Sequence, residues 1–215
     1  MVELPRIRKL MAYHLSRPVI NFISKTPITP NTITWIGFLL SLTAVVLVIT
    51  NNLIVAGIIV LVAGFCDILD GALARSTNQT TRFGTILDST LDRISEAALL
   101  LGILILFLFN PESSIFFGLI PKQWSISLVN LALLASMLVS YIRARAETQG
   151  LECQIGIFTR NERMITVTLG LLLGHLESAL SIALVIITVL SFITAVQRLH
   201  YIRQETRNDR SRRKN

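Results

Sequence analysis

The chain has 215 residues, of which 52% are hydrophobic and 15% are charged, and its mean hydropathy is +0.64. Soluble domains carry about 25% charged residues, so this composition excludes an ordinary soluble protein and indicates an integral membrane protein. The net charge of +7 comes from 20 Lys and Arg against 13 Asp and Glu. No aromatic-rich basic stretch accompanies it, so we expect lipid-headgroup and orientation charge and no nucleic-acid partner.

Apolar segments, taken in chain order, predict an all-α fold in a single domain covering residues 1–215. Residues 4–24 mix basic and apolar side chains, which predicts an amphipathic helix on the membrane surface or, alternatively, a basic flank that only sets orientation. Six membrane spans of roughly 20 residues each are expected after it, at 33–50, 53–75, 83–109, 124–146, 160–174 and 178–200. Residues 205–215 are predicted to form a solvated, disordered basic tail.

Lys and Arg are concentrated before the first span, between spans two and three, between spans four and five, and after span six. With six spans, all of these segments lie on one side of the membrane. Basic connections favour the cytoplasm. We therefore expect a multi-pass protein of the cell membrane with both termini and the connection around Arg82 in the cytoplasm.

Charged residues interrupt the second and third spans. Asp67, Asp70 and Arg75 are spaced to share one helical face, and Asp88 and Asp92 share a face of the next helix. A short connection makes these helices antiparallel neighbours, and four close carboxylates require a cation. Oxygen ligands favour Mg2+, Mn2+ or Ca2+ over zinc, and two such ions would clamp a phosphoryl group. An intramembrane ion-pair network or a divalent cation pathway is the alternative, although Arg75 would repel cations.

The same residues carry a resemblance. Eight positions fit the long, fixed motif D-x-x-D-G-x-x-A-R-x8-G-x3-D-x3-D, namely Asp67, Asp70, Gly71, Ala74, Arg75, Gly84, Asp88 and Asp92. In this motif, and in the expected six spans, the chain resembles the CDP-alcohol phosphotransferase family. The resemblance implies that a hydroxyl attacks the lipid-bearing phosphate of a CDP-linked lipid and releases CMP. It also implies a homodimer.

The resemblance further implies roles for individual residues. Two Mg2+ ions, or Mn2+, would be held by Asp67, Asp70, Asp88 and Asp92, and Asp92 would also be the base for the attacking hydroxyl. The CDP part of the lipid would contact Asn31, Thr34, Gly71, Ala74, Arg75, Thr81 and Gly84. For Asn31 and Thr34 the alternative is helix capping. Glu96, one turn beyond Asp92, is expected to pair with an arginine instead of binding metal.

Three arginines near the cytoplasmic ends of later spans suggest the acceptor. Arg143, Arg163 and Arg203 would together bind a dianionic phosphate, although flanking charge explains any one of them. The segment around Arg143 and the Arg-x-Glu-Arg pattern ending at Arg163 resemble the branch whose acceptor is inositol 1-phosphate. That branch more often has lysine at the position of Arg143. The expected reaction moves a phosphatidyl group from CDP-diacylglycerol; glycerol 3-phosphate as acceptor and an archaeal ether-lipid donor are the alternatives.

Overall fold

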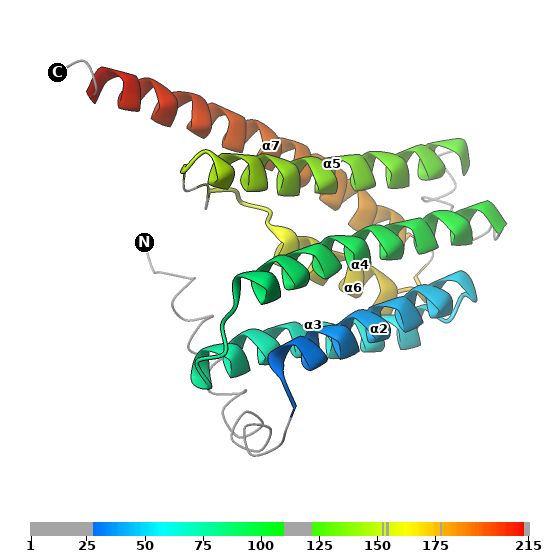
Figure 1. Ribbon diagram of the computed structural model, residues 1–215. Coiled ribbons are helices and arrows are strands. Elements are labelled where there is room, and N and C mark those ends of the chain that lie inside the picture. The colour runs from blue at the N-terminus through cyan, green and yellow to red at the C-terminus, as the bar shows by residue number, and fades with distance from the viewer. Residues whose placement is uncertain (1–27, 110–121, 152, 154, 177, 213–215) are drawn as a thin grey trace, which may run out of the picture.

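The computed structural model describes residues 28–109, 122–151, 153, 155–176 and 178–212. These residues form six α-helices and no strand (Figure 1). The helices are α2 (Pro30–Ile49), α3 (Leu53–Ser76), α4 (Arg82–Phe109), α5 (Lys122–Thr148), α6 (Arg160–Leu172) and α7 (Ala179–Arg212). The all-α prediction is confirmed for this part of the chain. The predicted surface helix at 4–24 lies outside the described residues.

Local chemistry explains where the helices begin. Thr29 caps α2 by accepting a hydrogen bond from the backbone of Thr32 at 3.3 Å, and Pro30 follows at the first helical position, where its missing N–H costs nothing. The helix thus starts three residues before the predicted span. At α6, the Glu162 carboxylate accepts a hydrogen bond from the backbone of Thr159 at 2.8 Å and another from its hydroxyl, which completes a capping box.

The predicted disorder of the tail is wrong for residues 205–212. Helix α7 continues through them to Arg212, because Arg, Gln and Glu are strong helix formers and no Gly or Pro interrupts the segment. In Figure 1 this end of α7 extends beyond the neighbouring helices.

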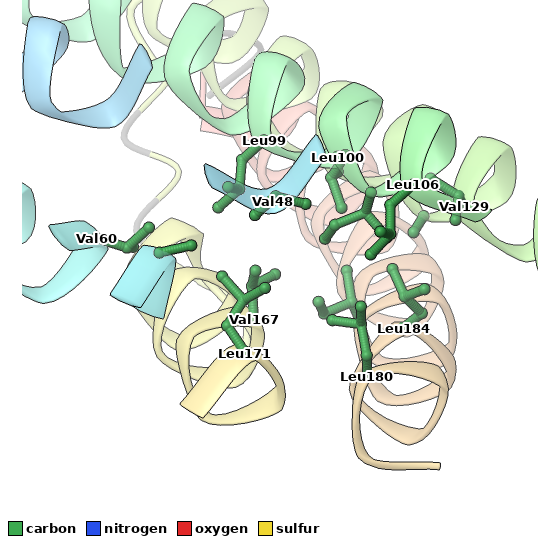
Figure 2. Close-up of a cluster of buried hydrophobic side chains, with 14 of the residues drawn as sticks. Val48, Val60, Leu99, Leu100, Leu106, Val129, Val167, Leu171, Leu180 and Leu184 are labelled. Carbon is green, nitrogen blue, oxygen red and sulfur yellow. The ribbon is translucent and has the colours of Figure 1, made fainter. Parts of the chain in front are cut away.

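The helices pack as a closed ring. Neighbouring pairs run from α2 to α3, α6, α7, α5, α4 and back to α2. Close approach at two of these contacts depends on glycine, since a Cβ on Gly170 would lie 2.8 Å from Ala183 and one on Gly102 would lie 3.0 Å from Val45. Buried aliphatic side chains from all six helices meet inside the ring (Figure 2). Because every helix contributes to it, this core fixes the relative positions of the polar helix ends.

Four helices are long and apolar enough to cross a membrane: α2, α3, residues 124–148 of α5 and residues 179–207 of α7. Helix α6 is the shortest, and its 13 residues rise about 20 Å, less than the roughly 30 Å of a hydrocarbon core. Helix α4 is long enough, but Asp92, Arg93 and Glu96 interrupt its apolar sequence. Many large apolar side chains on the outside of the ring are exposed, including Leu39, Val46 and Val196.

Candidate active site

A cavity of about 230 Å³ lies where the start of α2, the end of α3 and the start of α4 meet. All seven residues expected to contact CDP line it, together with two of the four aspartates and four residues that the sequence reasoning missed. The lining comprises Pro30, Asn31, Thr34, Asp70, Gly71, Ala74, Arg75, Gln79, Thr80, Thr81, Gly84, Thr85 and Asp88. The missed residues are Pro30, Gln79, Thr80 and Thr85. Each of them lies within two positions of a predicted CDP contact in the sequence, and this proximity could have indicated them.

Two glycines of the cavity wall, Gly71 and Gly84, lie close to polar side chains of the cavity. A Cβ on Gly71 would lie 3.3 Å from Nη1 of Arg75, so the guanidinium lies directly over this glycine. A Cβ on Gly84 would lie 3.0 Å from the Thr81 hydroxyl and 3.1 Å from Oδ1 of Asn31. The Gly84 backbone also donates to the Thr81 hydroxyl at 2.9 Å. Both glycines therefore leave room where a larger residue would crowd the cavity wall.

Thr34 ties the start of α2 to the carboxylates. Its hydroxyl lies 2.6 Å from Oδ2 of the buried Asp70 and 3.1 Å from the Pro30 carbonyl. Because Thr29 caps the helix, the capping alternative for Thr34 does not describe its contacts. A hydrogen bond to one carboxylate oxygen orients Asp70 and leaves its other oxygen for a further partner.

The four aspartates of α3 and α4 lie within electrostatic reach of one another. Arg160, at the start of α6, brings a positive charge to two of them. Its Nη1 lies 2.7 Å from Oδ2 of Asp92, and both Nη1 and Nη2 lie 3.2 Å from Oδ2 of Asp67. Sequence reasoning placed Arg160 only among the basic flanking residues; its position in the Arg-x-Glu-Arg pattern was the available signal.

The aspartates are chemically suited to hard divalent cations, which prefer carboxylate oxygens. A cation, the Arg160 guanidinium, already bridges Asp67 and Asp92, so this part of the site accepts positive charge. Within the described ranges, no group of three or more His, Cys, Asp or Glu is arranged to hold a metal ion. The donor set therefore fits a divalent metal, but the side chains would have to converge further to form a complete ligand shell.

Arg163 does not stand free as a phosphate ligand. Its side chain is 1% exposed and its Nε and Nη2 lie 2.5 and 2.9 Å from the two oxygens of Glu96, which is 3% exposed. Nη2 also lies 3.4 Å from the Ser140 hydroxyl, while Nη1 is buried without a hydrogen-bond partner among the described residues. The expectation that Glu96 pairs with an arginine is confirmed.

The other two predicted acceptor arginines have different surroundings. Arg143 is half-exposed and pairs with Glu147 one turn along α5, at 2.8 Å. Arg203 is exposed on α7. Arg198, which sequence reasoning did not select, is buried and donates to the carbonyls of Val139 and Ile155 at 2.6 and 2.8 Å. Arg198 therefore ties α7 to α5 and to the segment before α6, and it interacts electrostatically with Arg143 and Arg163.

Several known proteins resemble this chain over most of its length. Archaetidylinositol phosphate synthase of Pyrococcus horikoshii is 41% identical over 174 residues, which cover 80% of this chain and 82% of the relative. The enzyme of the same name from Methanothermobacter thermautotrophicus is 37% identical over the same shares. Phosphatidylinositol phosphate synthase of Mycobacterium tuberculosis is 32% identical, covering 94% of this chain and 92% of the relative.

Solved structures of the M. tuberculosis enzyme agree with this fold. The structure with CDP-DAG bound matches with a TM-score of 0.78, at 32% identity, over 88% of this chain and 94% of that one. The structure with manganese and citrate matches with a TM-score of 0.77, over 87% of this chain and 88% of that one. The family model for CDP-alcohol phosphatidyltransferase matches residues 27–197, and the chain therefore belongs to this family of transferases.

Proposed function

We propose that this protein transfers the phosphatidyl group of CDP-diacylglycerol to a hydroxyl of inositol 1-phosphate, giving phosphatidylinositol phosphate and CMP. The observation that carries the proposal is the cavity beside Asp70 and Asp88, into which all seven residues expected to contact CDP converge. The name of each relative described above supports an inositol phosphate lipid as the product. Membership of a transferase family sets aside the cation-pathway alternative.

Asp67, Asp70, Asp88 and Asp92 would hold the divalent metal, two Mg2+ ions or Mn2+. When bound, the metal would neutralise the diphosphate and polarise the phosphorus under attack. A related enzyme has been solved with manganese, which supports a divalent ion here. Thr34 would hold Asp70 in place for this role through its 2.6 Å hydrogen bond.

The chain's own groups would bind the donor and move one proton. Arg75, lying over Gly71, would neutralise a phosphate of the CDP group. Asp92 would accept the proton of the inositol hydroxyl as that oxygen forms its bond to the lipid-bearing phosphorus. The bond from this phosphorus to the CMP oxygen then breaks, and CMP leaves with the electron pair.

We assign the acceptor phosphate to Arg143, Arg163 and Arg203. Arg163 is committed to Glu96 through two nitrogens, so Nη1, which has no partner among the described residues, is the group it would offer. Arg143 and Arg203 are more exposed and able to turn toward a soluble anion. Arg198 would hold the α5 and α7 backbones between them.

We further propose that all six helices lie in the cell membrane as spans, with residues 4–24 as a surface helix. The charged half of α4 would face protein or water, and α6 would lie between α3 and α7, its neighbours in the ring. Both termini and the carboxylates would face the cytoplasm, where inositol 1-phosphate is soluble, and the protein would act as a homodimer. The four apolar helices and the exposed aliphatic surface support membrane insertion.

The archaeal relatives favour a second donor. Their names specify archaetidyl products, so a CDP-linked ether lipid is the alternative to CDP-diacylglycerol. The site described above would recognise the CDP group and the phosphates, which both donors share. Glycerol 3-phosphate remains the alternative acceptor because it also carries a phosphate dianion.

The test is CMP release by purified protein with Mg2+. Each donor lipid is combined separately with inositol 1-phosphate, glycerol 3-phosphate, free inositol and serine, and Asp92→Asn serves as the inactive control. Release with inositol 1-phosphate alone is the expected result, and the donor giving the faster release identifies the lipid. Release with free inositol or serine at the same rate would refute the acceptor-phosphate assignment, and release with no combination would refute the proposed reaction.

A further inference from the structure

Arg160 connects three helices. Its backbone begins α6, and its guanidinium reaches Asp67 on α3 and Asp92 on α4. These two carboxylates lie in the set assigned above to the metal. The guanidinium therefore supplies positive charge at the place where the proposed mechanism needs a divalent ion.

The contacts of Arg160 are less well matched in geometry than those of Arg163 one turn later, although one of them is short, 2.7 Å from Nη1 to Oδ2 of Asp92. Arg163 matches two nitrogens to two oxygens of Glu96, at 2.5 and 2.9 Å, with both side chains buried. Arg160 instead directs two nitrogens at one oxygen of Asp67, both at 3.2 Å, and its Nε is buried without a hydrogen-bond partner among the described residues. Its side chain is also 24% exposed. A forked pair with matched geometry is the stronger interaction, so the Arg160 contacts are the easier ones to exchange.

Resting on the metal site proposed above, we propose that Arg160 is a built-in counter-ion that competes with the divalent metal for Asp67 and Asp92. A metal ion on these oxygens would lie close to the guanidinium, and two cations at such distances repel strongly. Metal binding therefore displaces the guanidinium and breaks its ion pairs. The cost of breaking them is subtracted from the free energy of metal binding, so Arg160 lowers the affinity of the site.

The backbone of α6 does not have to move in this exchange. The capping box of Thr159 and Glu162 holds the helix start, and the buried pair of Arg163 with Glu96 holds the next turn against α4. The long Arg160 side chain can then swing away through its own rotatable bonds. Displacement is thus a side-chain event in a fixed helix.

Mn2+ affinity measures the competition without any need for catalysis. Free Mn2+ is quantified by electron paramagnetic resonance during titration of full-length wild-type protein, Arg160→Gln and Arg207→Gln. The last variant removes the same charge from an exposed position on α7 and controls for overall charge. We expect Arg160→Gln to bind Mn2+ roughly tenfold more tightly, and Arg207→Gln to bind as the wild type does.

Two other outcomes of the titration overturn the inference, and they are distinguishable. Equal or weaker Mn2+ binding by Arg160→Gln, with wild-type binding intact, refutes the competition alone. No Mn2+ binding by any of the three proteins refutes the metal site of the proposed function and the competition with it.

A second measurement uses the wild-type protein only, so it does not depend on a variant that folds. Phenylglyoxal modifies accessible arginines, and peptide mass spectrometry reports each position. Modification of Arg160 should be slow without Mn2+ and faster with it, while Arg163 stays unmodified in both conditions because it is buried against Glu96. An Arg160 rate that is unchanged or slower with Mn2+ overturns the inference.

Discussion

Replacing Arg163 with methionine tests whether the ion pair between α4 and α6 is needed for folding. The Glu96 carboxylate is 3% exposed and accepts from Arg163 at 2.5 and 2.9 Å. The substitution removes both contacts and leaves the two carboxylate oxygens without the guanidinium. Removing one partner of a buried pair typically costs about 3–5 kcal/mol, because the remaining charge stays desolvated. We expect a loss of stability in this range.

The assay is unfolding in mixed detergent and SDS micelles, followed by circular dichroism. A matched control is Arg143→Met, which breaks the half-exposed pair with Glu147 and should cost less than about 1 kcal/mol. The double variant Arg163→Met, Glu96→Leu removes both charges and should recover most of the lost stability, since an apolar replacement of a buried pair is often neutral. A single variant as stable as the control, or a double variant as unstable as the single one, would refute the reasoning.

The double variant also separates folding from substrate binding. If Nη1 of Arg163 binds the acceptor phosphate, the stable double variant should show a raised KM for inositol 1-phosphate and a nearly unchanged KM for the CDP-lipid. Wild-type values of both constants would mean that Arg163 acts only by holding α6 against α4.

Three further changes test the donor side. Asp92→Asn should lower CMP release by about 100-fold or more while CDP-lipid binding by equilibrium dialysis persists; retained turnover would remove Asp92 as the base. Gly84→Ala places a Cβ 3.0 and 3.1 Å from two cavity side chains and should raise the donor KM. Gly64→Ala is the control, because its Cβ would have no atom within 4 Å and the donor KM should not change. Equal effects of the two variants would contradict the assigned cavity. Thr34→Val removes a 2.6 Å hydrogen bond to the buried Asp70 carboxylate and should weaken Mn2+ binding about tenfold. The control Thr43→Val loses only a hydrogen bond to its own helix and should bind Mn2+ as the wild type does. Comparable losses in the two variants would exclude an orienting role for Thr34.

Helix positions were predictable from the sequence because apolar runs and breaks between them coincide with the ring of helices. The α3 boundaries differ from the prediction by one residue, Ser76. The predicted first span begins three residues after the start of α2, because an apolar run marks the apolar part of a helix and not its first turn, and Pro30 is compatible with a first helical position. The end of α7 was missed because charge was weighed above helix propensity.

The donor cavity was also predictable, since its residues lie in one contiguous stretch of α3 and α4 plus the start of α2. Spacing along a helix places side chains on a face, and a short connection places two helices together. The contacts of Arg160 could not be predicted in the same way. Arg160 is 93 residues from Asp67, and the sequence does not show which helices lie beside the start of α6.

The two ion pairs between α4 and α6 have different roles: one holds the helices together, and the other can be exchanged for a metal ion. Asp92 and Glu96 are one turn apart on α4, and their partners Arg160 and Arg163 are one turn apart on α6. The pair of Arg163 and Glu96 is buried and stays formed, because separating the two groups would leave an uncompensated buried charge. The shallower pair keeps access to solvent, so Arg160 can give up Asp92 to a competing cation. The same two helices can therefore hold their relative position while the carboxylate that accepts the proton changes its partner.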